Sequence, residues 1–196
     1  MEKPNKDLFE KIVKIAQNRG FVFNASSIYG GLRSSYDYGP LGALLKENIS
    51  QLWWKALKTS EVKIYPVDTA IIQSTDVWKA SGHLSEFSDP MVECKNCNSR
   101  FRSDSNFENV CCDQQELTDP KNFNLMFETN IGPVVNENSQ VFLRPETAQG
   151  IFVNFENVLR TMRAKLPFGI ANIGKSFRNE ITPGQFIFRT REFEQM

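Results

Sequence analysis

The chain has 196 residues, 40% of them hydrophobic, and its 23 basic and 23 acidic side chains give a formal net charge of zero. This length can bury a core, so one domain is expected. Zero net charge is unlike a dedicated nucleic-acid-binding domain, which is usually basic, so any nucleic-acid contact must be local. No apolar run approaches the roughly 18 residues that span a membrane, and the charged N-terminus reads as an amphipathic helix rather than a signal peptide. The sequence therefore predicts a cytoplasmic protein without a membrane partner.

The first half of the sequence predicts helices and short strands around a loop rich in glycine, serine and tyrosine. Apolar residues at helical spacing predict a first helix that Gly20 ends. A strand at 21–23 and the loop at 25–42 follow, and within that loop Pro40 opens a helix that continues to about Lys58. The later elements are a strand at 61–72 and a short helix that Ser74 and Thr75 cap and that ends at Gly82.

The second half begins with a change of composition. Residues 87–120 are polar and contain all four cysteines, which predicts an insertion. Strands are expected at 123–129 and 140–145, and a helix with one apolar stripe is expected from Glu146 to Met162. Segments 168–181 and 186–195 are predicted to form a closing hairpin with a turn at Pro183 and Gly184. This mixture predicts an α+β fold, with helices packed on an antiparallel sheet.

The closing hairpin concentrates charged side chains. Alternate residues of a strand share a face, so Arg178 and Glu180 are predicted to point one way. The same rule places four residues of the return strand on one face: Ile187, Arg189, Arg191 and Phe193. Guanidinium groups suit phosphate oxygens and an aromatic ring suits a nucleobase, so together they suit a nucleotide. The alternative is a solvated strand face with cross-strand ion pairs. No glycine-rich phosphate loop is present, so side chains on a sheet would have to hold the nucleotide.

The cysteines, the histidine and two tryptophans leave alternatives open. Cys94 and Cys97 form half of a zinc knuckle, and the adjacent Cys111 and Cys112 would be an unusual second half. The four side chains are either structural zinc ligands or reduced thiols. His83 is the single histidine and is interpreted as a turn or packing residue rather than a catalyst. The neighbouring Trp53 and Trp54 are expected in the core or in a dimer interface.

Several motifs resemble one enzyme family. The run Phe177-Arg178-x-Glu180, a loop and then Arg189-x-x-x-Phe193 resembles motif 2 of the class II aminoacyl-tRNA synthetases. Five stretches are similar to glycyl-tRNA synthetases of the homodimeric type: "IYGGLRSSYDYGPLGALLKENI", "VWKASGHLSEFSDPMV", "FNLMF", "FLRPETAQGIFVNF" and "FRNEITPGQFIFRTREFEQM". Ala70 stands where many class II enzymes carry a proline. Glycyl enzymes commonly lack that proline, so Ala70 supports the resemblance to them. The resemblance covers nearly the whole chain and implies a class II antiparallel sheet flanked by helices, with a small cysteine-containing insertion at 87–120.

The resemblance also implies an activity. Such enzymes are ATP-dependent glycine–tRNA ligases: they activate glycine to glycyl-adenylate and transfer it to the 3′ end of tRNA(Gly), with Mg²⁺ on the phosphates. The family's motif 3 and anticodon-binding domain are absent from residues 1–196, which implies an N-terminal part of the catalytic domain that need not be active alone. A homodimer is also implied. The alternative from another class is a non-catalytic, synthetase-like binding module, and a zinc-ribbon nucleic-acid binder is disfavoured by the neutral charge.

Site residues follow from the same resemblance. The implied catalytic residues are Arg178, which would bind the α-phosphate, and Arg189, which would lie near the reacting carboxylate and phosphate. The implied ATP site comprises Arg178, Asn179, Glu180, Phe188, Arg189, Thr190, Arg191, Glu192 and Phe193, whose ring would stack on adenine. The implied glycine site comprises Arg102, Glu146, Phe193, Glu194, Gln195 and Met196, with Glu146 holding the ammonium group. A metal site, if present, would comprise Cys94, Cys97, Cys111 and Cys112.

Overall fold

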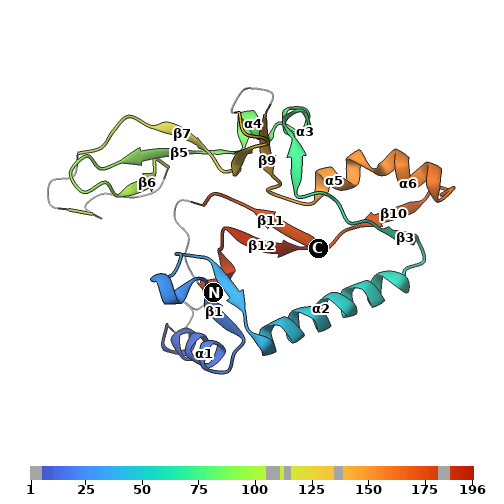
Figure 1. Cartoon of the computed structure of the whole chain (residues 1–196), viewed down its shortest axis with the longest axis horizontal. Coiled ribbons are helices and arrows are strands. Elements are labelled where there is room, and N and C mark those ends of the chain that lie inside the picture. The colour runs from blue at the N-terminus through green and yellow to red at the C-terminus, as the bar shows by residue number, and fades with distance from the viewer. Residues whose placement is uncertain (1–5, 105–110, 113–115, 135–138, 181–185) are drawn as a thin grey trace.

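The computed structural model describes residues 6–104, 111–112, 116–134, 139–180 and 186–196. The turn predicted at Pro183 and Gly184 lies outside these residues. One three-stranded sheet projects as an arm, and the last two strands and the C-terminus lie near the middle of the view (Figure 1). Helices combine with sheets that are mostly antiparallel, so the predicted α+β class is confirmed.

The N-terminal part forms as the sequence predicts. Its elements are α1 (Lys6–Asn18), β1 (Val22–Asn24), the 3₁₀ turn η1 (Ser27–Tyr29), β2 (Tyr36–Tyr38) and α2 (Pro40–Lys58). β1 lies at the strand predicted at 21–23 and pairs antiparallel with β2, which forms within the segment predicted as a loop. Pro40 occupies the first turn of α2, where its missing N–H costs nothing. Gly42 allows a close crossing, because a Cβ there would lie 1.9 Å from the carbonyl oxygen of Phe21.

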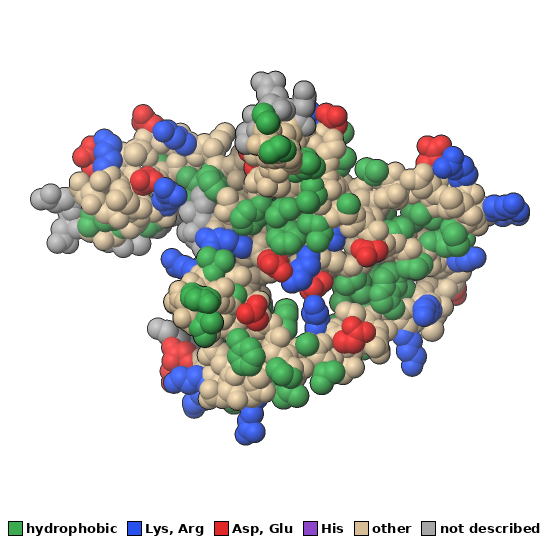
Figure 2. Space-filling model, viewed as in Figure 1, with side chains coloured by type: hydrophobic (Ala, Val, Ile, Leu, Met, Phe, Trp, Pro, Cys, Tyr) green, Lys and Arg blue, Asp and Glu red, His purple; other side chains and the backbone are tan. Residues whose placement is uncertain are grey.

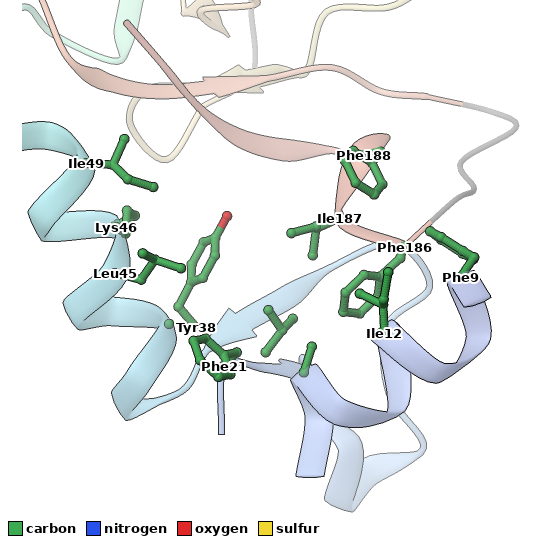
Figure 3. Close-up of a pocket in the computed structure, with 13 residues that line it drawn as sticks. Phe9, Ile12, Phe21, Tyr38, Leu45, Lys46, Ile49, Phe186, Ile187 and Phe188 are labelled. Atoms are coloured by element: carbon green, nitrogen blue, oxygen red, sulfur yellow. The ribbon is translucent and has the colours of Figure 1, made fainter. Parts of the chain in front are cut away.

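An apolar cavity of about 390 Å³ lies among these elements (Figure 3). Its wall also includes the 3₁₀ turn η2 (Phe186–Phe188), which comes from the far end of the sequence. The rings of Phe9 and Phe188 lie 6.3 Å apart, and those of Tyr36 and Phe186 lie 5.2 Å apart. The N-terminal helix and hairpin therefore support the segment that leads into the last strand.

The predicted strand at 61–72 is two strands in two sheets. β3 (Lys63–Pro66) pairs parallel with β10 (Phe168–Ala171), whereas β4 (Ile72–Ser74) joins the antiparallel sheet β4-β9-β8. That sheet contains β8 (Glu128–Asn130) and β9 (Gln140–Leu143). The hydrogen bonds of the backbone between these strands explain the change of sheet. Val67 N–H still donates to the carbonyl of Ala171 at the end of β10, whereas the carbonyl of Ile71 accepts the N–H of Arg144 at the end of β9.

The helix predicted after Ser74 is confirmed, and a second short helix that the sequence analysis did not predict follows Gly82. Ser74 caps α3 (Thr75–Ala80) by accepting the N–H of Asp76 at 3.3 Å. Gly82, with φ +78°, then redirects the chain into α4 (His83–Glu86). Trp78 is fully buried with Met126 and Phe142 in the main apolar cluster, against which Val77, Leu84 and Phe87 pack.

The helix predicted from Glu146 to Met162 is wrong in one respect, since it is broken in the middle. It forms α5 (Ala148–Val153) and α6 (Phe155–Thr161). The break falls at Asn154, whose side-chain amide donates to the carbonyl of Gly150 at 2.8 Å and so competes with the helical backbone. The apolar stripe is only partly covered in this chain, with Phe152 75% exposed.

The projecting arm is a sheet of order β6-β5-β7. Its strands are β5 (Ser88–Glu93), β6 (Arg100–Arg102) and β7 (Lys121–Asn124), and both neighbours pair antiparallel with β5. The predicted insertion at 87–120 supplies β5 and β6, and the arm extends away from the other elements in Figure 1.

The closing hairpin is shorter than predicted. β11 (Gly174–Phe177) pairs antiparallel with β12 (Glu192–Gln195), with Ser176 opposite Phe193. Because the return strand begins only at Glu192, the predicted shared strand face is wrong for three of its four members: Ile187, Arg189 and Arg191. The N–H of Arg178 still donates to the carbonyl of Arg191 at 2.9 Å, so Arg178 lies just beyond the paired strands.

Much apolar surface stays accessible. On α2, the exposed side chains include Leu44 (63%) and Leu52 (67%), and hydrophobic side chains are visible over the face shown in Figure 2. No helix in the described ranges is both long and apolar enough to cross a membrane.

Arg144 joins three segments in the interior. Its side chain is 1% exposed, its Nε donates to the carbonyl of Lys175 at 2.7 Å, and its Nη1 donates to the carbonyl of Thr69 at 2.7 Å and to the Thr69 hydroxyl at 2.8 Å. Burial lowers the pKa of Arg144 from its usual value. Gly174 makes room for this group, since a Cβ there would lie 2.2 Å from Nη2. The guanidinium thus fixes β9, β11 and the link between β3 and β4.

Replacing Arg144 with methionine should lower the free energy of unfolding of the purified chain by about 3 kcal/mol, because buried carbonyls lose charged donors. Urea unfolding measures this change. Arg100→Met is the control, because Arg100 pairs with Glu93 at the surface and such pairs contribute about 0.5 kcal/mol. Equal stability of the two variants would show that Arg144 does not organise the fold.

Candidate active site

Arg178 is held between two aromatic rings. Its guanidinium lies 5.6 Å from the ring centre of Phe87 and 5.3 Å from that of Phe193, within the range of cation–π contacts. Its Nε donates to the carbonyl of Pro145 at 3.2 Å. Phe193, predicted to stack on adenine, therefore contacts Arg178 in this structure. The rings and the carbonyl restrict the guanidinium before any ligand arrives.

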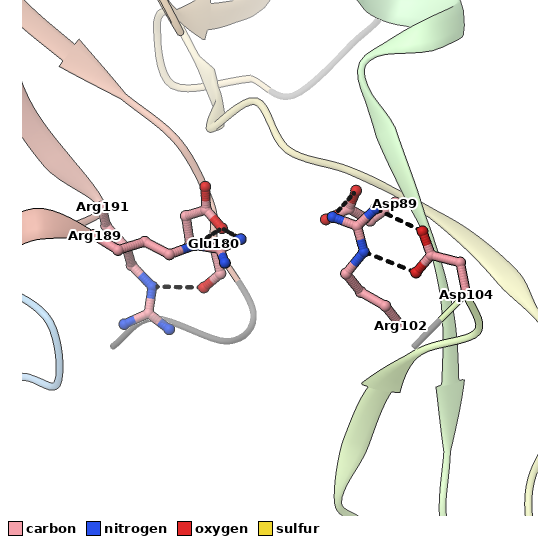
Figure 4. A network of polar contacts seen from close by, with 6 residues as sticks. All are labelled: Asp89, Arg102, Asp104, Glu180, Arg189 and Arg191. Atoms are coloured by element: carbon pink, nitrogen blue, oxygen red, sulfur yellow. Dashed lines mark hydrogen bonds and ion pairs between the residues drawn. The ribbon is translucent and has the colours of Figure 1, made fainter. Parts of the chain in front are cut away.

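Glu180 is enclosed by two other predicted site residues (Figure 4). Arg189 donates to its Oε2 through Nε at 3.1 Å and Nη2 at 2.7 Å. Arg191 instead donates to backbone, through Nε to the carbonyl of Glu180 at 3.2 Å and through Nη1 to that of Arg33 at 2.8 Å. Arg189 thus has a side-chain carboxylate as its resting partner, whereas Arg191 fastens the end of the hairpin to the N-terminal loop.

Arg102 is brought to this region on β6 of the arm. It forms ion pairs with Asp89 at 3.2 Å and Asp104 at 2.9 Å. Hydrogen bonding to Asp104, with the charges of Asp89 and Glu180, raises the pKa of Arg102, and the same hydrogen bond lowers the pKa of Asp104. Figure 4 shows this cluster facing the pair of Glu180 and Arg189. The arm and the hairpin therefore approach one another at predicted substrate-binding residues.

Glu146 has partners that the sequence analysis missed. Gln149 Nε2 donates to Oε1 of Glu146 at 2.8 Å, and His83 Nε2 lies 3.6 Å from the same oxygen. His83 also packs as predicted, with ring centres 5.4 Å from Trp78 and 5.3 Å from Phe87. Spacing in the sequence gave no sign of the contact between His83 and Glu146, because the two residues come together only through α3 and α4.

The other predicted site residues lie around this centre with local partners. Glu194 pairs with Lys46 at 2.9 Å, and Glu192 pairs with Lys175. Gln195 Oε1 accepts the N–H of Thr147 at 2.9 Å, so the end of β12 adjoins the start of α5. Thr190 Oγ1 donates to the carbonyl of Glu192, and the N–H of Asn179 donates to the carbonyl of Leu125. The ring of Phe188 lies near that of Phe9, and Met196 is 44% exposed.

The four cysteines converge in the arm. Their Sγ atoms all lie within 4.8 Å of one another, including 3.7 Å between Cys94 and Cys112 and 3.8 Å between Cys111 and Cys112. Backbone hydrogen bonding at Cys97 lowers the pKa of Cys94 to about 6, and burial raises that of Cys111 to about 12. Tetrahedral Zn²⁺ with bonds of about 2.3 Å sets its sulfurs about 3.8 Å apart, so the cluster fits the ion.

The residues predicted to bind ATP and those predicted to bind glycine approach one another at Pro145 and Glu146. Arg178 binds the carbonyl of Pro145, and the next side chain along the chain is the Glu146 carboxylate. Phe87 contacts Arg178 on one side and His83 on the other, and His83 faces Glu146. A cation suited to phosphate therefore lies beside an anion suited to an ammonium group. This arrangement can bind a nucleotide phosphate next to an amino acid.

Solved structures share this architecture. A threonyl-tRNA synthetase structure from Cryptosporidium parvum matches 93% of this chain and 34% of its own with a TM-score of 0.59 and 22% identity. A prolyl-tRNA synthetase from Cryptosporidium parvum, solved with halofuginone and AMPPNP, matches 99% of this chain and 30% of its own with a TM-score of 0.61 and 12% identity. The fold is that of the class II aminoacyl-tRNA synthetases.

Curated relatives narrow the assignment. Glycine–tRNA ligases from Borreliella afzelii and Caldanaerobacter subterraneus are 55% and 49% identical to this chain over 95% and 98% of its length. The chain belongs to the glycine–tRNA ligase family. It covers 43% and 48% of those two relatives, so it spans a little under half of their length. A scan against protein-family models finds no match.

Proposed function

We propose that this chain forms the glycine- and ATP-binding part of a glycine–tRNA ligase. The observation that carries the proposal is the contact of Arg178 with the carbonyl of Pro145, the residue before Glu146, which brings a guanidinium that would bind phosphate close to a carboxylate that would bind an ammonium group. Relatives at about half identity that are named glycine–tRNA ligases support the same reaction. Residues 1–196 would then be part of a class II catalytic domain that contains motifs 1 and 2, with 87–120 as its insertion.

In the first step, the carboxylate oxygen of glycine attacks the α-phosphorus of ATP, and the bond to the β-phosphate breaks to release pyrophosphate. Arg178, prearranged by two rings and a carbonyl, would bind the α-phosphate and stabilise the negative charge that develops there. Arg189 would leave the Glu180 carboxylate to meet the phosphates. Glu146 would hold the ammonium group and align the carboxylate for attack. Mg²⁺, when bound, neutralises the phosphate charges.

The second step and the partners are part of the same proposal. The adenylate would pass its glycyl group to the 3′ end of tRNA(Gly), with AMP as the leaving group. The ligase would act as a homodimer in the cytoplasm. The exposed apolar faces of α1 and α2 would be covered within the complete assembly, because large apolar patches on a soluble protein indicate contact surfaces.

The arm would carry a structural zinc ion. Cys94, Cys97, Cys111 and Cys112 would bind it as thiolates, which matches the spacing of their sulfurs. The ion would join the turn after β5 to the segment 111–112, which has no partner strand in the described part of the arm. Its role would be to hold the shape of the arm that presents Arg102.

Arg178→Ala, in a ligase of the relatives' length that contains this sequence, should slow glycine-dependent ATP–pyrophosphate exchange at least about 100-fold, because a charge-stabilising donor is lost. Arg160→Ala, on the exposed side of α6, is the control and should keep full exchange. Exchange within about threefold of the parent enzyme would remove Arg178 from the phosphate site.

Glu146→Gln should raise the glycine KM strongly and leave the ATP KM almost unchanged, because the shape is kept and the charge is lost. The competing explanation is that Glu146 only favours the start of α5, which an acid stabilises by at most about 1 kcal/mol. Glu156→Gln is the control, since Glu156 lies in the first turn of α6. Steady-state exchange kinetics would reject the amino-acid role if the glycine KM of Glu146→Gln matched the parent.

Zinc should be present at up to one ion per chain in protein purified without chelator, and the double substitution Cys94→Ser with Cys97→Ser should remove it. Elemental analysis by mass spectrometry measures both preparations. A parent protein without zinc contradicts the site. Equal zinc in the double variant would place the ion elsewhere.

A further inference from the structure

The Glu146 carboxylate is contacted through one of its two oxygens. Gln149 Nε2 donates to Oε1 at 2.8 Å, and His83 Nε2 lies 3.6 Å from that same atom. Within the described ranges, no hydrogen bond or ion pair reaches Oε2. The side chain of Glu146 is 30% exposed. A ligand can therefore reach the carboxylate, although Oε1 already has protein partners.

His83 is fixed from three sides. Its Nδ1 lies 2.9 Å from Ser81 Oγ, and its ring packs against Trp78 and Phe87. The side chain is 14% exposed. If the Ser81 hydroxyl donates to Nδ1, the neutral ring carries its proton on Nε2 and directs it at Glu146. In that tautomer, the α3–α4 turn directs an N–H toward the carboxylate from a ring that packing holds in place.

The orientation of the Gln149 amide leaves one buried polar atom without a hydrogen bond. Its Nε2 binds Glu146, but its Oε1 is buried and has no hydrogen-bond partner among the described residues. An unpaired buried acceptor destabilises a protein. The opposite amide orientation would place this oxygen against the carboxylate. The arrangement therefore favours a firmly held Glu146 over the stability of α5.

We propose that Gln149 and His83 are positioning residues that hold Glu146 by Oε1, so that Oε2 receives the ammonium group of the amino acid. The inference rests on the proposed role of Glu146 in glycine binding. An ammonium group offers three donors and no acceptor, so it requires an oxygen that other donors have not taken. Groups fixed before binding reduce the ordering cost that the ligand would otherwise meet.

Gln149→Met in the full-length ligase tests the first residue. Methionine has a similar length and no polar hydrogen. The glycine KM should rise about tenfold, as for loss of a hydrogen bond to a charged group, with the ATP KM unchanged. The melting temperature should not fall, because the unpaired oxygen is removed as well. A lower melting temperature with an unchanged glycine KM would overturn the proposal in favour of a structural role.

His83 is tested by two substitutions. His83→Met removes the donor and should also raise the glycine KM. His83→Gln returns an N–H near the position of Nε2 and should restore most of the parent value. If the two variants have the same glycine KM, the donor on His83 does not position Glu146. If Gln149→Met fails to fold, the comparison of His83→Met with His83→Gln still tests whether a neighbouring donor positions Glu146.

A matched control comes from α2, where Gln51 Nε2 donates to Glu47 Oε1 at 2.9 Å on an exposed surface. Gln51→Met removes the same kind of bond and should change neither KM. Glu146→Gln distinguishes failure of the proposed glycine site from failure of the positioning role of Gln149 and His83. If it leaves the glycine KM unchanged, the proposed glycine site fails. If it raises the glycine KM while Gln149→Met and His83→Met do not, only the positioning role is overturned.

Discussion

The buried guanidinium of Arg144 is the interaction on which the arrangement of this chain depends. It binds the backbone of Thr69 and Lys175 and lies at the end of β9. The strands it connects belong to separate small sheets, which share no continuous ladder. A charged group inside a protein must satisfy its hydrogen bonds, and here the segments around Thr69 and Lys175 provide the oxygens. The next residues along the chain, Pro145 and Glu146, begin the candidate site, so their position follows from this anchor.

Charge in the candidate site is balanced locally. Arg189 pairs with Glu180, Arg102 with two aspartates, and Glu194 with Lys46. The candidate site is therefore rich in ionised side chains, and most of those charges are paired at short range. Arg178 differs, since its partners are rings and a carbonyl. Among the described residues no carboxylate pairs with Arg178, so its charge stays available for a phosphate, which fits the role proposed for it.

The arm and the body meet at the site from different parts of the sequence. β6 carries Arg102 toward the Glu180–Arg189 pair, and the cysteine cluster lies in the turns of the same arm. Phe87 stands where the arm leaves α4, and its ring touches both His83 and Arg178. The ring of Phe87 therefore connects the base of the arm to two residues of the candidate site.

The sequence by itself determined the local features and the family resemblance. Pro40 and the apolar spacing after it predicted α2 to its last residue, and Ser74 predicted the cap of α3. The motifs around Arg178 and Glu146 predicted the class II fold. These signals are local, because capping, periodicity and motif spacing act over a few residues.

Only the tertiary structure decided which groups meet. The break at 67–71 follows from pairing with Ala171 and Arg144, and the short return strand of the hairpin places Arg191 on the backbone of Arg33. The contact of His83 with Glu146 spans 63 positions and arises because α3 and α4 pack beside the start of α5. No periodicity in a sequence encodes such contacts, since they depend on how separate elements pack together.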